Sequence, residues 1–342
     1  MLTGFRGSVM RSNLTVGTRI RLLVAIRAYQ AATMHRTSPG LNTLSGLAPR
    51  RCAPPFPDIP QMLSYRHGFH AGNHADVLKH IVLVALLRIL TRKDKPVVVV
   101  DTHAGAGMYS LEQGFAVRNA EFREGIALLW ECNDLPEPVA DYLDQVRALN
   151  ADGVLRHYPG SPRIALGVLR PQDRLRLFEL HSTEGSILAE QFAKEGRRVT
   201  VTAGDGFAGL KAVLPPQSRR GFVLIDPSYE LASDYRAVVA ALRDGMRRFA
   251  TGTYAVWYPL LQRRESIELP DRLRRAAGRD WLDIALQVRA PSPEGRGLHG
   301  SGMFIVNPPW KFSEQMRGIM PWLTRTLAQD AGACFRLDAR ET

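Results

Sequence analysis

Four short apolar runs, each closed by an acidic residue or a glycine-rich turn, constrain the fold of this chain more than any other feature. The runs are Pro96–Asp101, Leu175–Leu180, Arg198–Ala203 and Phe222–Asp226. Strands buried on both faces have this near-continuous apolar character, whereas half-exposed strands alternate between apolar and polar residues. Because helical stretches recur between the runs, the sequence predicts a parallel sheet with helices on both faces.

The C-terminal half continues this pattern and then changes it. Further strands are expected at Tyr254–Tyr258, Leu282–Arg289 and Met303–Asn307. A Pro/Gly-rich loop joins the last two, which predicts a terminal antiparallel pair. Ahead of the first strand, Asn73 is a suitable N-cap for a helix over His74–Arg92. Seven strands ending in such a pair resemble the Rossmann-like class I methyltransferase fold, an α/β fold that binds ligands at the carboxyl ends of its strands.

One internal segment is too long for its place in this pattern. Between Gly107 and the helix expected near Ser161–Leu169 lie about fifty residues, where an ordinary strand-to-helix turn has roughly 2–6. Ile126, Leu129 and Tyr142 are among the apolar residues that fall there at helical spacing. The sequence therefore predicts an inserted helical subdomain over about 109–158.

The first sixty residues differ in composition from the remainder. Residues 1–61 hold eight arginines, no lysine and a single acid, Asp58, and no helical or alternating period is sustained there. We expect a disordered extension, with the methyltransferase domain spanning 62–342. A transit-like address and an upstream start codon mistaken for a true start at Met62 both explain such a segment, and the second interpretation is favoured.

The overall composition narrows the classes of partner. Lys and Arg number 45 against 33 Asp and Glu, and the net charge of +12 favours a polyanionic partner. Three cysteines without a CxxC pair argue against a disulfide framework or a zinc site and favour the cytoplasm. The most apolar run, Ile81–Leu90, is far shorter than the ~20 residues that cross a bilayer, so no membrane association is expected.

A nucleoside cofactor is indicated by residues at the ends of the first three strands. Gly105 and Gly107 follow the first strand and allow a close backbone approach. Glu179 at the end of the second can accept hydrogen bonds from both ribose hydroxyls, and Asp205 after the third can accept one from an adenine amine. The alternative is that both acids serve only as helix-start residues, where carboxylates are favoured.

The fourth strand ends in Asp226-Pro227-Ser228-Tyr229, a pattern suited to methylating an amine. The lone pair of an adenine amine is delocalised into the ring, and hydrogen-bond acceptors on its two N–H bonds restore its nucleophilicity. The Asp226 carboxylate and the Pro227 carbonyl can supply these acceptors, and Asp226 can also take the proton that is lost. Tyr229 offers an aromatic face for an extruded base. The alternative is a structural proline turn with a buried tyrosine.

A second string, Asn307-Pro308-Pro309-Trp310, matches the amino-methyltransferase pattern more literally. It follows the final expected strand, however, and not the fourth. By strand order this position is remote from the central crevice, so the string is interpreted as the stop of an edge strand.

Histidines concentrate before the first strand, at positions 67, 70, 74 and 80. His70 and His74 have a spacing found in metal sites, but no cysteine or third spaced acid completes the set, so no metal is expected. Four segments, this one included, carry a resemblance to a known family. They are Met62–His80, Asp101–Gly107, Tyr158–Ser161 and Gly252–Pro259. They resemble the RlmJ family, which uses S-adenosylmethionine to methylate an adenine amine of 23S ribosomal RNA, and the resemblance extends from Met62 to about Leu323.

The resemblance implies roles for individual residues. Those implied to line the cofactor are His80, His103, Ser161, Glu179, Asp205 and Gly206, with Asp226 bordering it. Asp226 would be catalytic and Tyr65 would contact the RNA. The enzyme is expected to be a monomer. The family commonly has Asp-Pro-Pro-Tyr where this chain has Ser228, and because both acceptors survive, Ser228→Pro is expected to leave activity equal or higher.

Other functions compatible with the sequence remain. A DNA adenine methyltransferase would use the same catalytic residues. A protein glutamine methyltransferase would instead rely on Asn-Pro-Pro-aromatic after the fourth strand, where this chain has Asp226. A catalytically decayed RNA-binding protein is suggested only by Ser228 and by paired arginines such as Arg219-Arg220 and Arg263-Arg264, which are usually solvated surface.

Overall fold

The computed structural model describes residues 67–113, 119–278 and 280–340. All of them belong to one compact unit, residues 61–342. The expectations for residues 1–61 and for Tyr65 lie outside the described residues.

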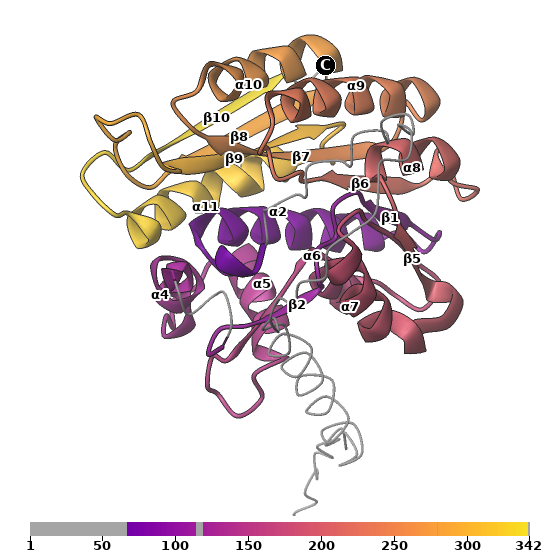
Figure 1. Ribbon diagram of the computed structural model, residues 1–342, viewed down its shortest axis with the longest axis horizontal. Helices are drawn as coiled ribbons and strands as arrows, with labels where there is room; N and C mark the ends of the chain where they lie inside the picture. The colour runs from indigo at the N-terminus through magenta and orange to yellow at the C-terminus, as the bar shows by residue number, and fades with distance from the viewer. Residues whose placement is uncertain (1–66, 114–118, 279, 341–342) are drawn as a thin grey trace, which may run out of the picture. The chain divides into compact units, whose positions relative to one another are not determined.

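A single large sheet organises this unit (Figure 1). Its strand order is β10-β8-β9-β7-β6-β1-β4-β5. The strands are β1 Val98–Asp101, β4 Arg174–Glu179, β5 Val199–Ala203, β6 Gly221–Ile225, β7 Thr253–Leu260, β8 Trp281–Gln287, β9 Gly300–Val306 and β10 Cys334–Arg340. The first five of these pair in parallel, whereas β9 runs antiparallel to both β7 and β8. This is the class I methyltransferase arrangement, and it confirms the predicted fold class.

Two features of the C-terminal strands differ from the expectation. The strand before Asn307 is not an edge strand, because β9 lies between β7 and β8 and is buried along its whole length. The edge is formed instead by β10, which pairs antiparallel with β8 and was not predicted. An edge strand with mostly exposed or half-exposed residues lacks the apolar run that identifies a buried strand.

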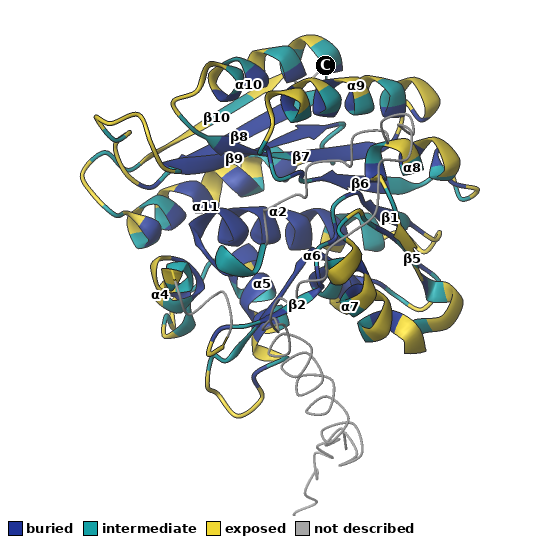
Figure 2. Ribbon diagram, in the orientation of Figure 1, coloured by how far each residue is buried: buried dark blue, intermediate teal, exposed yellow. Residues whose placement is uncertain are grey.

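Helices cover both faces of the sheet (Figure 2). One apolar core contains residues of α2, α6, α7 and α11, and a second, on the other face, contains residues of α8, α9 and α10. Their bounds are α2 His74–Thr91, α6 Ser161–Val168, α7 Ser182–Phe192, α8 Gly206–Val213, α9 Ala232–Arg248, α10 Arg264–Ala277 and α11 Phe312–Leu327, with the short 3-10 helices η1 His67–Phe69 and η3 Ala193–Arg198. None of the helices that the structure describes is long and apolar enough to span a membrane.

Helix α2 begins where the sequence predicted. The Asn73 side chain accepts hydrogen bonds from the backbone N–H groups of Ala75 and Asp76, which satisfies donors that the first helical turn leaves open. Every residue from His74 to Leu87 is buried, because this helix packs under the sheet and is covered by the segment that follows β1. Its polar residues consequently need partners inside the protein.

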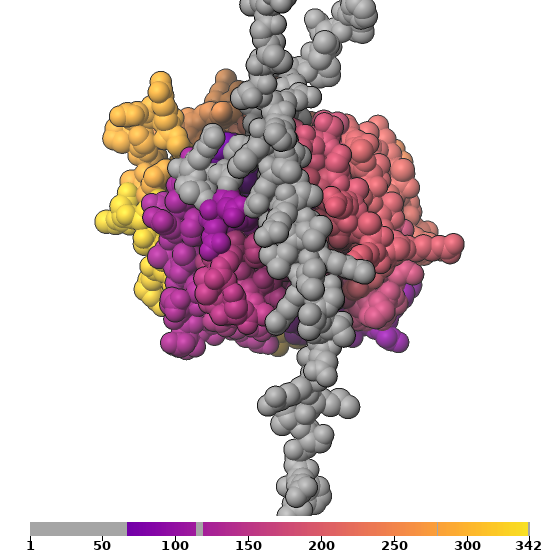
Figure 3. Space-filling view, turned by 60° about the horizontal axis from the view of Figure 1, so that its bottom comes forward, coloured from indigo at the N-terminus to yellow at the C-terminus, as the bar shows by residue number. Residues whose placement is uncertain are grey.

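The segment between β1 and α6 holds its own small elements. They are β2 Met108–Ser110, η2 Glu121–Glu124, α4 Ile126–Trp130, α5 Glu137–Arg147 and β3 His157–Pro159. Strands β2 and β3 pair antiparallel, which brings the two ends of the segment together. In the space-filling view this segment occupies one side of the face shown and the red segments that follow α7 occupy the other (Figure 3). We propose that it is the helical insertion into the domain.

Candidate functional site

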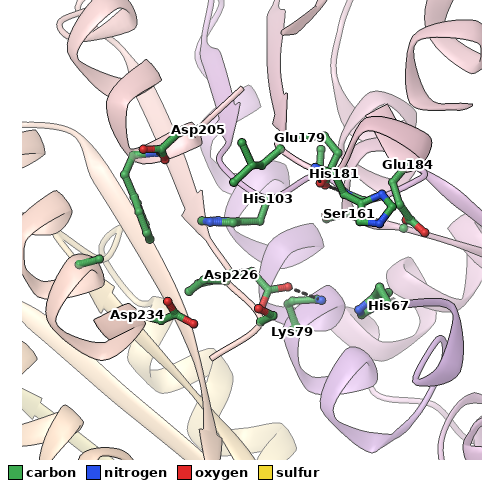
Figure 4. A pocket seen from close by; sticks show the side chains of 18 of the residues that line it. His67, Lys79, His103, Ser161, Glu179, His181, Glu184, Asp205, Asp226 and Asp234 are labelled. Atoms are coloured by element: carbon green, nitrogen blue, oxygen red, sulfur yellow. Dashed lines mark hydrogen bonds and ion pairs between the residues drawn. The ribbon is translucent and has the colours of Figure 1, made fainter. Parts of the chain in front are cut away.

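A cavity of about 320 Å³ opens at the carboxyl edge of the parallel strands, the edge at which this fold class binds ligands. Its volume lies in the range of small-molecule sites. Its lining includes Lys79, His103, Gly105, Ser161, Glu179, Leu180, Asp205, Phe207, Asp226, Pro227 and Ser228. The acids that follow the predicted strands, Glu179, Asp205 and Asp226, therefore line one cavity (Figure 4).

Glu179 and Asp205 lie on neighbouring strand ends and are both anchored. The Glu179 carboxylate accepts hydrogen bonds from the backbone N–H groups of Gly105, at 2.7 Å, and His181, also at 2.7 Å. Asp205 accepts one through Oδ1 from the Phe207 N–H, at 2.8 Å, and thereby caps α8. The capping role expected as the alternative is thus present, but Asp205 also lines the cavity, and its carboxylate has a second oxygen that can accept a hydrogen bond.

Of the three glycines predicted at the site, one lines the cavity and two are needed for packing between elements. Gly105 lines the cavity with a φ of +60°, a left-handed conformation that glycine adopts without strain. Gly107 packs against Leu188 and Phe192 of α7. A Cβ on Gly206 would lie 2.0 Å from the Thr102 carbonyl oxygen, so Gly206 is required by strand-to-helix packing. Neither Gly107 nor Gly206 lines the cavity.

His103 forms part of the cavity wall in a neutral state. Burial lowers its pKa to about 4, although the carboxylates of Asp226 and Asp205 act in the opposite direction. Its Nδ1 lies 2.8 Å from the Thr102 hydroxyl, and its ring meets the Phe207 ring edge-on at 4.9 Å. A neutral imidazole beside an aromatic ring offers a flat apolar surface together with one ring nitrogen for hydrogen bonding.

Ser161 and Asp101 link the start of α6 to the end of β1. The Ser161 hydroxyl donates to Asp101 Oδ2 at 2.6 Å. Burial raises the pKa of Asp101 to about 6, and the nearby Asp226 carboxylate adds to the shift, whereas the Ser161 hydrogen bond opposes it. Asp101 was not assigned a role from the sequence, although its position at the end of the first strand could have suggested one.

Asp226 is held by a lysine that sequence analysis missed. Lys79 Nζ lies 2.6 Å from Asp226 Oδ2 and 2.8 Å from Asp76 Oδ1. Burial alone would lower the pKa of Lys79, but the two carboxylates outweigh it and hold that pKa above its ordinary value. The ammonium is therefore charged and occupies one oxygen of Asp226, which leaves Oδ1 for another donor. A lysine three residues after an acid in an otherwise apolar helix was a signal for such a pair, because buried lysines need counter-charges.

The loop after β6 meets the expectation only in part. Asp226, Pro227 and Ser228 line the cavity. Tyr229 does not: its side chain is buried, and its hydroxyl donates to the Trp257 carbonyl at 2.6 Å. A φ of +53° turns this residue toward β7 and α9. In this structure Tyr229 anchors the loop and does not present a stacking face to the cavity.

His80 also departs from its implied position. It is fully buried in α2 and lies outside the cavity lining, with Nδ1 2.8 Å from the Tyr158 hydroxyl. Tyr158 in turn lies 3.0 Å from the Tyr142 hydroxyl. This chain of polar contacts joins α2 to the insertion. His80 is therefore one layer behind the cavity wall.

Two other histidines of that segment, His67 and His70, have acidic partners. His67 lies 2.9 Å from Asp76, and His70 lies 2.9 Å from Glu121. Within residues 67–113, 119–278 and 280–340, no three His, Cys, Asp or Glu side chains gather in an arrangement that could hold a metal ion. The first pair joins η1 to α2, and the second connects the turn before α2 with the insertion.

The side chains that line the cavity fit S-adenosylmethionine. Two carboxylates at adjacent strand ends can accept hydrogen bonds from the ribose hydroxyls and the adenine amine. The exposed Leu180 side chain, next to Glu179 in the chain, offers an apolar surface to a base. When bound, the cofactor supplies a methyl group on a sulfonium. Asp226 lies in the same cavity, on the side formed by β6 and α2 (Figure 4).

Comparisons with known proteins place this chain in a methyltransferase family. The model of the family described as "Ribosomal RNA large subunit methyltransferase D, RlmJ" matches residues 94–337. Two relatives are both named "Ribosomal RNA large subunit methyltransferase J". The Escherichia coli protein is 49% identical over 262 residues, which cover 77% of this chain and 93% of that protein. The Haemophilus influenzae protein is 48% identical over 278 residues, which cover 81% and 98%.

A solved structure extends the similarity to three dimensions. Protein LPL1258 from Legionella pneumophila is 34% identical, with a TM-score of 0.74 over 79% of this chain and 98% of that chain. The family match, over residues 94–337, covers strands β1 to β9, Glu179, Asp205 and the Asp226 loop together. The chain belongs to the RlmJ family of S-adenosylmethionine-dependent methyltransferases.

Proposed function

We propose that this protein methylates the N6 amine of a specific adenine in 23S ribosomal RNA. The names of its relatives support ribosomal RNA of the large subunit as the substrate class. The adenine amine is supported by the residues of the cavity, where a carboxylate followed by a proline shares one space with the two cofactor acids. The net charge of +12 favours a nucleic acid over a protein substrate.

Asp226 and Pro227 would hold the target amine. One N–H of the amine donates to Asp226 Oδ1, because Oδ2 is occupied by Lys79 at 2.6 Å. The other N–H donates to the Pro227 carbonyl, whose direction is restricted by the fixed proline φ. Two acceptors on the N–H bonds draw the nitrogen toward tetrahedral geometry and direct its lone pair at the methyl group, so that positioning supplies much of the rate enhancement.

The ion pair with Lys79 also suits Asp226 to this role. Lys79 Nζ lies 2.6 Å from Asp226 Oδ2, the geometry of a charge-assisted contact between an ammonium and a carboxylate. An ionised carboxylate can only accept hydrogen bonds, which is what an amine donor needs. After transfer, the methylated nitrogen carries an extra proton, and Asp226 is the nearest base that can take it.

The observation that carries the proposal is the position of Asp226 in the cavity that also contains Glu179 and Asp205. The test uses 23S ribosomal RNA from cells that lack the modification, S-adenosylmethionine with a labelled methyl group, and nucleoside analysis of the product. The wild-type protein should yield N6-methyladenosine. Asp226→Asn should lose at least about 100-fold in turnover while it binds the cofactor as the wild-type protein does in calorimetry.

Matched arms separate the competing functions. Adenine-containing duplex DNA and a protein extract are offered under the same conditions. Methyl transfer to DNA in preference to RNA, or full turnover by Asp226→Asn, would overturn the proposal. Cofactor binding without transfer to any RNA would favour a decayed enzyme that retains only binding.

A further inference from the structure

The structure separates the roles of two neighbouring arginines at the start of α10. Arg264 is 86% exposed in its side chain and forms an ion pair with Glu268, one helical turn later, at 2.6 Å. Arg263 instead donates from Nη1 to the Tyr229 carbonyl oxygen at 3.3 Å. Among residues 67–113, 119–278 and 280–340, Arg263 has no ion-pair partner. Its charge is therefore not balanced by a contacting carboxylate of this part of the chain.

Helix capping does not explain why an arginine occupies position 263. Arg263 is the N-cap residue of α10, and its side chain makes no capping hydrogen bond. Ser, Thr, Asp and Asn stabilise an N-cap, whereas a cation near a helix N-terminus is opposed by the helix dipole. The contact that Arg263 makes is not with its own helix but with the loop that follows β6, through Tyr229, and a residue that breaks a local preference in this way is often retained for function.

Arg263 lies beside the loop that carries the reactive groups. Strand β7 ends at Leu260, at the same carboxyl edge as β6, so the connection to α10 runs next to the Asp226 loop. The Tyr229 carbonyl, which Arg263 contacts, is three residues after Asp226. Arg263 is exposed and is not one of the cavity-lining residues, so it stands outside the cavity wall.

A nucleotide whose base enters the cavity keeps its sugar-phosphate backbone outside. A cation just outside the wall is therefore suited to a phosphate and not to the base. The guanidinium has five N–H donors in a planar fork; the contact with the Tyr229 carbonyl uses one of them, and the Tyr235 hydroxyl is near enough to use another. The remaining donors can bind phosphate oxygens in the two-point geometry that arginine favours.

We propose that Arg263 binds a backbone phosphate next to the target nucleotide and thereby ties RNA docking to the position of the Asp226-Pro227 loop. This inference rests on the proposed function, because it assigns part of the RNA surface of the same site. Arg263 acts on the reacting groups through the Tyr229 carbonyl, so it is a positioning residue.

The test compares Arg263→Ala and Arg263→Lys with the matched control Arg264→Ala, on 23S ribosomal RNA that lacks the modification. Arg263→Ala should raise KM for RNA about tenfold, as expected for loss of a charge-assisted phosphate contact. The slope of log KM against log salt concentration should fall by the amount that one phosphate contact contributes, about 1. Arg263→Lys should retain the slope with a smaller rise in KM, and Arg264→Ala should match the wild-type protein.

Two further measurements keep the result unambiguous. Cofactor affinity should be unchanged in Arg263→Ala, because it does not depend on a phosphate contact, and the unfolding free energy should fall only by the roughly 0.5–1.5 kcal/mol of the lost hydrogen bond to Tyr229. Unchanged KM and salt slope, whatever the effect on kcat, would overturn the inference. RNA affinity measured in the Asp226→Asn background is independent of turnover, so a loss of binding there supports the Arg263 contact even where methylation fails and the proposed function is contradicted.

Discussion

Lys79 Nζ lies between the carboxylate of Asp226, which lines the cavity, and the buried carboxylate of Asp76, 2.6 Å from Asp226 Oδ2 and 2.8 Å from Asp76 Oδ1. Asp76 also accepts hydrogen bonds from His67 Nε2 and the Gly72 N–H, each at 2.9 Å. The start of α2 and the loop after β6 are thus joined by one charged network. The carboxylate proposed to hold the target amine depends for its orientation on a residue 147 positions earlier in the chain.

Lys79→Met should therefore reduce both stability and turnover. The substitution keeps the apolar stem and leaves Asp76 and Asp226 without their shared cation. Removing one partner of a buried ion pair typically costs about 3–5 kcal/mol, and we expect a loss of that order in urea unfolding. Lys79→Arg keeps the charge and is the control. Wild-type stability in Lys79→Met would show that the network is not a source of folding free energy.

Asp205→Asn should separate the capping role of Asp205 from its proposed role in cofactor binding. Asparagine caps helices as well as aspartate does, so the bond to the Phe207 N–H should survive and the unfolding free energy should stay within about 0.5 kcal/mol. With its one oxygen kept for the cap, the asparagine amide presents an NH2 donor where the aspartate has its second acceptor oxygen. We expect the Kd for S-adenosylmethionine to rise about tenfold in calorimetry. An unchanged Kd would leave Asp205 with the capping role alone.

His103 should make the protein sensitive to acid. Its ordinary pKa of 6.5 is lowered to about 4 in the folded state, so the unfolded chain binds more protons between these values and stability rises with pH across that window. Its stabilising contribution is fully present above about pH 6.5 and is lost as the pH falls toward 4. His103→Gln should flatten the dependence of unfolding free energy on pH between 4 and 6.5. An unaltered pH profile would contradict this.

The sequence predicted the parallel strands and the two acids, Glu179 and Asp205, that line the cavity, because both features leave local signals. A buried strand is a short apolar run, and an acid or glycine directly after it marks the binding edge, as at Glu179 and Asp205. Side-chain direction leaves no such signal. The left-handed backbone of Tyr229 and the full burial of His80 depend on contacts with Trp257 and Tyr158, which are distant in sequence. Lys79 was missed for the same reason, because its partner Asp226 belongs to another part of the chain.

Asn307→Ala tests whether the second amino-methyltransferase-like string takes part in the reaction. Because β9 runs antiparallel to its neighbours, Asn307 lies at the edge of the sheet opposite the cavity. Its side-chain amide donates to the carbonyl oxygens of Ala250 and Gly252, at 2.8 and 2.7 Å, and holds the turn before β7. Two carbonyls that lose their donor, together with a φ of +51° that alanine adopts less readily, should cost about 1–3 kcal/mol of stability.

The same variant should retain wild-type kcat and KM when assayed well below its unfolding temperature, since none of these contacts reaches the carboxyl edge. Methyl transfer and urea unfolding measured on one preparation separate the two effects. A stable but inactive Asn307→Ala would mean that this string, and not Asp226-Pro227, holds the target amine. Loss of stability with full activity would instead assign Asn307 to the turn that positions β7, the strand whose Trp257 carbonyl anchors Tyr229.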